Sequence, residues 1–211
     1  PWEETLRDLA AMGSSAVPHL AAQLEGEPPV RRQFASRALA RIGEAALPAV
    51  LEVLRQGSPE GRAAAARAIW LMECCPRKAL TGLLRAAEDP DPEVRREAMW
   101  GLGSREPLPK AAERRLRGGL RDAEARVRVA AVMSLGRMTA RQRVPERVPR
   151  AELLRLLQDP DLGVREVAAL TLWDLGEPDR TILPPLLPTL QDPYAAGRTA
   201  QLPGPALSMI V

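Results

Sequence analysis

The sequence predicts an all-α fold, a right-handed superhelix of about six stacked helix pairs. An apolar position returns along the chain at intervals of 30, 30, 33, 33 and 37 residues. A second apolar period precedes each of these positions, and short turns rich in proline, glycine and aspartate separate the two. Such repeats are typical of arrays in which each helix pair covers the apolar face of its neighbour. The returning position is Leu9, Leu39, Ile69, Leu102, Leu135 and Leu172.

The residues around this position predict the second helix of each pair. A small residue stands four positions earlier, and a further apolar residue stands three positions later in most copies. Offsets of four and three place these residues on one stripe of a helix. We expect alanine in that stripe because a neighbouring helix must approach closely. The residues four positions earlier are Thr5, Ala35, Ala65, Ala98, Ala131 and Ala168.

The upstream apolar period predicts the first helix of each pair. A proline lies near the start of each such helix, where its missing N–H costs nothing. The prolines are Pro18, Pro48, Pro76, Pro109, Pro149 and Pro184. The apolar triplets are Val17-Leu20-Leu24, Leu47-Val50-Leu54, Leu80-Leu83-Leu84, Ala112-Leu116-Leu120, Leu153-Leu156-Leu157 and Leu183-Leu186-Leu190.

Glycines and arginines mark the two ends of each second helix. Glycine near the C-terminal end predicts a cap in the left-handed conformation. The arginine after each turn predicts a bidentate contact with a carboxylate of the adjacent turn, although an anion-binding row is the alternative. The glycines are Gly13, Gly43, Gly103, Gly136 and Gly176, and the arginines are Arg32, Arg62, Arg95, Arg128 and Arg165.

Residues 89–103 (DPDPEVRREAMWGLG) and 159–173 (DPDLGVREVAALTLW) resemble HEAT-like repeats, of the short variety also found in bilin lyase subunits. The resemblance covers about residues 1–200 and implies an α-α superhelix, a HEAT-repeat solenoid. It implies little about function, because this repeat serves many unrelated roles.

The predicted array occupies residues 1–200, and residues 201–211 form an irregular C-terminal tail. The first and last repeats are incomplete, since residues 1–13 match a second helix alone. The ends of solenoids normally carry polar caps, whereas these ends are apolar. We therefore expect truncation, docking to another domain or self-association, and the chain can be one module of a larger protein.

Composition excludes several classes of function. His19 is the only histidine and asparagine is absent, which excludes a histidine-based triad and a multi-histidine metal site. Cys74 and Cys75 are adjacent and cannot complete a four-ligand zinc site. No apolar run approaches the length of a membrane span. We expect no metal, no cofactor and no membrane partner, and a cytoplasmic location.

Five residues are predicted to line a groove. In HEAT-like arrays the second helices form the inner wall, and a residue two positions after each alanine points away from the core stripe at about 100° per residue. An exposed tryptophan near methionine marks a contact surface. The alternative is packing of these side chains between neighbouring repeats. Arg37, Arg67, Trp100 and Met133 occupy this position and Trp173 lies nearby in the sequence pattern, and we name these five the groove residues.

Residues 105–150 hold 13 basic and five acidic residues, whereas the whole chain has a net charge of only +3. Such a patch can dock an acidic protein, a nucleic acid or a phosphorylated ligand, or can be a solvated surface. Nucleic acid is less favoured, because aromatic residues do not interleave with the basic ones. We name Arg114, Arg115, Arg141 and Arg143 the basic patch.

These features predict a non-catalytic protein-interaction scaffold, not an enzyme. Its partner is expected to be another protein with an acidic or extended segment. One alternative is a nucleic-acid-binding protein similar to alkylpurine DNA glycosylases, which use Trp, Asp and Arg residues on a concave surface. Trp100, Trp173 and Asp174 offer residues of these types. Another alternative is a subunit similar to those of bilin lyases.

Overall fold

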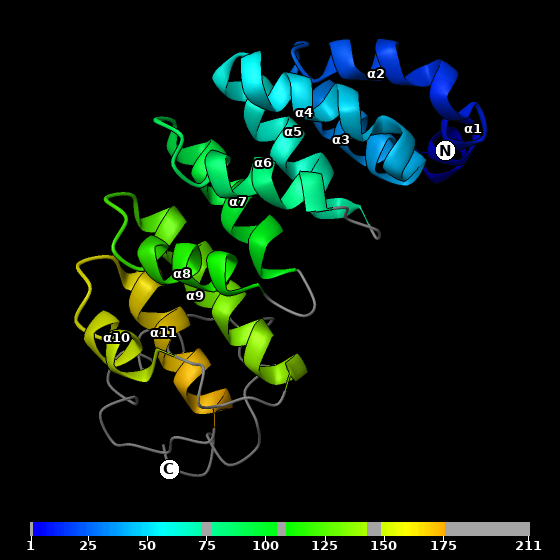
Figure 1. Cartoon of the computed structure of the whole chain (residues 1–211). Coiled ribbons are helices and arrows are strands. Elements are labelled where there is room, and N and C mark those ends of the chain that lie inside the picture. Colours follow the sequence, from blue (N-terminus) through cyan, green and yellow to red (C-terminus); the bar gives the residue numbers. More distant parts are fainter. Residues whose placement is uncertain (1, 73–76, 105–108, 143–148, 176–211) are drawn as a thin grey trace. The chain divides into compact units, whose positions relative to one another are not determined.

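The computed structural model describes residues 2–72, 77–104, 109–142 and 149–175, and these contain helices and turns but no strand (Figure 1). The chain divides into two compact units, residues 1–138 and 139–211, and each is described by itself. The α-helices are α1 (Trp2–Ala11), α2 (Val17–Gln23), α3 (Pro29–Ile42), α4 (Leu47–Gln56), α5 (Pro59–Leu71), α6 (Arg77–Ala86), α7 (Pro92–Gly103), α8 (Lys110–Gly119), α9 (Ala125–Gln142), α10 (Arg150–Leu156) and α11 (Leu162–Asp174).

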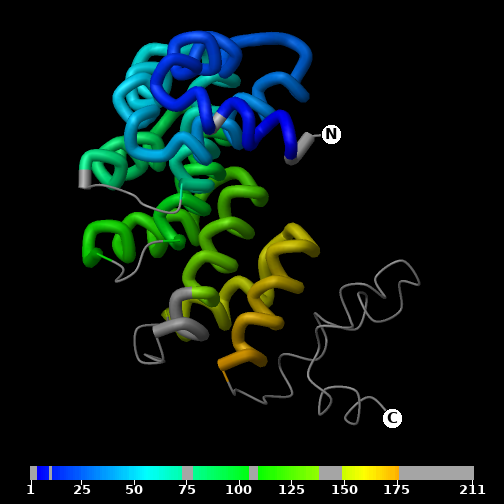
Figure 2. The backbone as a smooth tube through the Cα atoms, turned by 90° about the vertical axis from the view of Figure 1, so that its right-hand side faces the viewer, coloured from blue at the N-terminus to red at the C-terminus, as the bar shows by residue number. Residues whose placement is uncertain are grey.

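The first unit consists of two layers of helices. The second helices of the repeats pack in sequence, α1 on α3, α3 on α5 and α5 on α7. The first helices α2, α4, α6 and α8 pack likewise, and each repeat joins the layers through pairs such as α4 with α5. Figure 2 shows these helices as hairpins stacked in chain order from blue to green. In the second unit α10 packs against α11. The predicted all-α superhelical fold class is confirmed.

The predicted apolar stripe forms the core. Leu39, Ile69, Leu102 and Leu135 are fully buried in the first unit, as is Leu172 in the second. The alanines four positions before them are also fully buried, so the second helices meet at small residues, as expected. The first copy differs, since Thr5 is exposed and Leu9 is half-buried.

Buried serines join neighbouring second helices. The Ser36 hydroxyl donates to the Ala64 carbonyl at 2.8 Å, and the Ser134 hydroxyl donates to the Met99 carbonyl at 3.0 Å. A carbonyl inside a helix already accepts one hydrogen bond and has a second lone pair for such a donor. Each serine therefore adds a directional contact to an otherwise apolar interface.

The predicted glycine caps are confirmed in two places and wrong in two others. Gly13 and Gly43 have positive φ angles of 57° and 76°. Gly103 is the last residue of α7 without a positive φ, and Gly136 lies inside α9. At Gly103 a Cβ would lie 2.3 Å from the Ser134 Cβ, so this glycine is required by close helix packing and not by a cap. Gly176 lies outside the described residues.

The predicted arginine–carboxylate contacts are confirmed for Arg62 and Arg95. Arg62 donates to both carboxylate oxygens of Asp89 at 2.8 Å, and Arg95 binds Asp122 in the same way at 2.8 Å. A third nitrogen of each arginine donates to a carbonyl of its own turn, such as that of Gly57 or Asp89. One guanidinium therefore fastens two successive turns together.

The pKa of Asp122 reflects this contact. Burial by itself raises the pKa, but hydrogen bonds from Arg95 and from the Glu124 N–H, with the charges of Arg95 and Arg128, outweigh it. The pKa of Asp122 therefore lies below its ordinary value. The ionised Asp122 carboxylate therefore stabilises the folded chain.

The first junction between turns uses a different contact. Gln56 stands where later turns have aspartate, six residues before the turn arginine, and Arg32 instead pairs with Glu27 of its own turn at 2.6 Å. The Glu25 carboxylate accepts hydrogen bonds from the N–H and the hydroxyl of Ser58. A Cβ at residue 57 would lie 2.2 Å from a Glu25 carboxylate oxygen, so glycine at this position leaves room for the substitute contact.

Candidate functional site

The four groove residues of the first unit lie on successive second helices, from α3 to α9. Arg37 is exposed, and no hydrogen bond or ion pair to another described residue engages it. Trp100 and Met133 are half-buried. Their exposure is therefore intermediate between the two alternatives from the sequence, a position in the groove and packing between neighbouring repeats. In the second unit, Trp173 is half-buried on α11.

Trp100 is part of an aromatic and cationic cluster. Its ring centroid lies 6.2 Å from that of Trp70 on α5, with the planes tilted by 36°. The Arg137 guanidinium carbon of α9 lies 4.8 Å from the Trp100 ring centroid. A cation over a partly exposed indole contributes about 0.5–1 kcal/mol. The three helices thus hold the Trp100 ring in one orientation while part of it stays accessible.

Trp70 was not predicted as a member of this site. It directly follows the core residue Ile69, as Trp173 directly follows Leu172. This shared register was the available signal in the sequence. The stacking of two rings from different repeats became visible only in the packed structure.

Arg67 belongs to a group of paired charges. It donates to the Glu97 carboxylate at 2.5 Å, and Arg96 donates to the same oxygen at 2.6 Å. Only 3% of the Glu97 side chain is exposed. Burial by itself lowers the pKa of Arg67, but the hydrogen bond to Glu97 and the charges of Glu97 and Glu93 raise it overall. The Arg67 guanidinium is therefore already paired within the chain, unlike that of Arg37.

The basic patch is described in part. Arg114 on α8 is exposed, and no ion pair to another described residue engages it. Its neighbour Arg115 forms an ion pair with Glu88. Arg141 lies in α9, where only the backbone is described, and Arg143 lies outside the described residues. Within the described part of the patch, Arg114 is the cation available to a partner.

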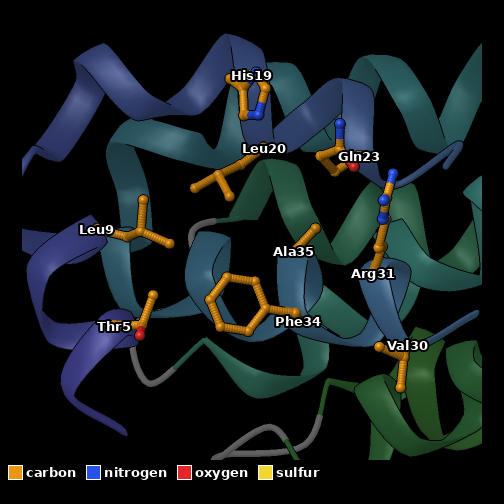
Figure 3. Close-up of a pocket in the computed structure, with 9 residues that line it drawn as sticks. All are labelled: Thr5, Leu9, His19, Leu20, Gln23, Val30, Arg31, Phe34 and Ala35. Atoms are coloured by element: carbon orange, nitrogen blue, oxygen red, sulfur yellow. The ribbon is translucent and has the colours of Figure 1, made fainter. Parts of the chain in front are cut away.

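Two cavities lie in the first unit. One has a volume of about 720 Å³ and opens between α1, α2 and α3, with the Phe34 ring near its centre (Figure 3). Thr5 and Leu9 line it, which accounts for their exposure in the first repeat. The other, of about 510 Å³, lies between α4 and α6 and is lined by both apolar and basic side chains.

The described residues contain neither a cluster of metal ligands nor a membrane-spanning helix. Among them, no three His, Cys, Asp or Glu side chains gather as metal ligands would. No described helix combines the length and the apolar character needed to cross a membrane. Cys74 and Cys75 lie outside the described residues, as do the helices expected after residue 175 and the tail 201–211.

Comparison with known proteins identifies the repeat. A family model described as HEAT repeats matches residues 47–114, 80–150 and 114–202. The structure is similar to one chain in the structure of the complex of CpcE and CpcF of phycocyanin lyase from Nostoc sp. PCC7120, with a TM-score of 0.64 and 29% identity over 74% of this chain and 98% of that chain. A designed armadillo repeat protein in complex with the peptide (KR)4 has a TM-score of 0.53 and 22% identity, over 88% of this chain and 96% of that chain. A search of the curated proteins gives no match.

Proposed function

Because the chain belongs to the HEAT-repeat family, as its repeat pattern predicts, we propose that it is a non-catalytic scaffold that binds another protein across its second helices. The repeat fold is typical of non-catalytic scaffolds, and the similar structures include a chain from a complex of two proteins and a designed protein in complex with a peptide. The observation that carries the proposal is the Trp100 ring, held by Trp70 and Arg137 yet only half-buried.

The exposed cations of the second helices favour an acidic or extended partner segment. Arg37 and Arg137 are exposed, whereas the guanidinium of Arg67 is already paired with Glu97. A carboxylate of the partner would therefore meet Arg37 or Arg137, and an apolar side chain would cover Trp100. Aromatic and arginine side chains are the residue types that most often dominate binding energy at protein interfaces. Met133 lies on α9 of the same unit, and Trp173 on α11 is a separate candidate contact of the second unit.

The test is quantitative capture of partners from the native lysate, followed by titration of the captured protein with variants. Trp100→Ala is expected to weaken binding by about 30-fold, as for a central aromatic anchor, with unchanged far-UV circular dichroism. Arg37→Glu is expected to weaken it by about threefold to tenfold. Met12→Ala and Arg121→Glu are the controls, because both side chains are exposed and neither belongs to the groove residues.

Two results would contradict the proposal. Loss of helicity in Trp100→Ala would show that this ring is a core residue. Equal binding by Trp100→Ala and Met12→Ala would show that the partner binds elsewhere. Tight binding of DNA that weakens steeply with salt, with the slope reduced by substitution of Arg141 and Arg143, would favour the nucleic-acid alternative.

The likeness to phycocyanin lyase supports a second candidate function. That structure is a complex of two chains, CpcE and CpcF, and the similarity covers 98% of the matched chain. We infer that a second repeat protein is a candidate partner and that the pair, and not this chain alone, would carry any lyase activity. Co-purification with a second repeat chain, together with activity that requires both chains, tests this candidate.

A further inference from the structure

The cavity between α4 and α6 lies on first helices, away from the groove residues. Its lining includes the apolar side chains of Leu51, Leu54 and Ala86. Gly82 brings the two helices close, since a Cβ there would lie 2.7 Å from a methyl carbon of Leu51. The volume of about 510 Å³ falls within the range of binding pockets, about 300–1,000 Å³.

The charges at the rim of this cavity are unbalanced. Its lining holds four cationic side chains and, as the one acidic side chain among these described residues, Asp89. Arg62 is neutralised by Asp89 and Arg55 by Glu52, each at 2.8 Å. Lys78 and Arg85 are exposed, and neither side chain has an ion pair or hydrogen bond to another described residue. The sequence of α6, RKALTGLLRA, contains no acidic residue.

The two unpaired cations share one face of α6. They are seven residues apart, which corresponds to two helical turns, or about 10.5 Å along the axis. Thr81 and Gly82 lie between them on the same face, and both line the cavity. The result is an apolar trough along α4 and α6 with a positive charge at each end of its α6 side.

We propose that this trough binds an amphipathic acidic helix of a partner protein. A helix that lies along α6 presents carboxylates seven residues apart at the spacing of Lys78 and Arg85. Its apolar residues at the intervening positions would enter the trough above Leu51 and Ala86, as in helix-in-groove recognition. Exposed carboxylate–cation pairs set orientation and register, while burial of the aliphatic side chains supplies most of the affinity. This surface is separate from the groove residues, so the two proposals fail independently.

The test uses the full chain and a synthetic, fluorescein-labelled helical peptide with leucines on one stripe and two glutamates seven residues apart beside it. Fluorescence anisotropy measures binding. Lys78→Glu/Arg85→Glu is expected to weaken binding by about tenfold, roughly threefold for each exposed pair removed. Arg121→Glu/Arg126→Glu is the matched control with the same change in net charge, and it is expected to change binding by less than about twofold.

Charge exchange and sequence scrambling complete the design. A peptide with lysine in place of both glutamates is expected to bind Lys78→Glu/Arg85→Glu better than the original chain. A scrambled peptide of the same composition is expected to bind weakly, since its leucines no longer form a stripe. Trp100→Ala is expected to leave peptide binding unchanged.

Four results would overturn the proposal. They are the absence of saturable binding, equal losses in the two double variants, equal binding of the scrambled peptide, and loss of binding in Trp100→Ala. The second and third would reduce the effect to net charge. The fourth would place the peptide on the second helices instead.

Discussion

Removal of the Asp122 carboxylate tests how strongly one repeat is fastened to the next. Asp122 and Arg95 form two hydrogen bonds at 2.8 Å, with only 13% and 17% of their side chains exposed. A hydrogen bond to a charged group contributes about 1.5–3 kcal/mol. Partial exposure and side-chain entropy reduce the sum for this pair. We expect Asp122→Ala to lower the free energy of unfolding by about 2–3 kcal/mol, including the acceptor lost by the Glu124 N–H.

A double-mutant cycle separates the pair from its surroundings. Urea unfolding followed by far-UV circular dichroism is measured for the original chain, Asp122→Ala, Arg95→Ala and the double variant. Arg95→Ala also removes hydrogen bonds to the carbonyls of Asp89 and Pro90, so its total cost is larger. The expected coupling free energy is about 1–2 kcal/mol. A coupling below about 0.3 kcal/mol would refute the view that this contact fastens the two turns.

Two further predictions concern acid stability and helix packing. Because the pKa of Asp122 is lowered in the folded chain, its stabilising effect is complete above about pH 4, the pKa region of an unfolded aspartate, and is lost as the pH falls through the folded pKa. The stability difference between the original chain and Asp122→Asn should therefore shrink on acidification, and a difference that stays constant down to about pH 2 would contradict this sign. Gly103→Ala should lower the unfolding free energy by about 1–3 kcal/mol, because its Cβ would lie 2.3 Å from the Ser134 Cβ. Gly118→Ala is the control with no atom within 4 Å, and a similar loss there would show that the cost at residue 103 is not steric.

The predicted site was only partly recoverable from the sequence. The repeat register placed Arg37, Arg67 and Trp100 at one position of successive second helices. It could not distinguish the exposed Arg37 from Arg67, whose partner Glu97 lies 30 residues further along the chain. The Trp70 ring was missed because its role depends on contact with Trp100 across a repeat boundary.

The glycines also show which features the sequence predicts and which depend on packing between helices. Gly43 follows its core residue Leu39 by four positions and Gly103 follows Leu102 by one, and of these two glycines only Gly43 adopts a positive φ. The neighbouring helix explains the glycine at residue 103, since Ser134 of α9 occupies the space that a side chain there would need. A helix-end pattern reports local backbone needs and contains no information about that neighbour.

The sequence by itself determined the repeat, the helix pairs, the alanine and leucine core and the class of contact that the turn arginines make. These features follow from helical periodicity and from the chemistry of adjacent residues. Only the tertiary structure decided which charges are paired, as in Arg67 with Glu97, and which stay available, as in Lys78 and Arg85. The physical reason is that a hydrogen bond or ion pair depends on placement to within about half an ångström, and packing between repeats sets that distance.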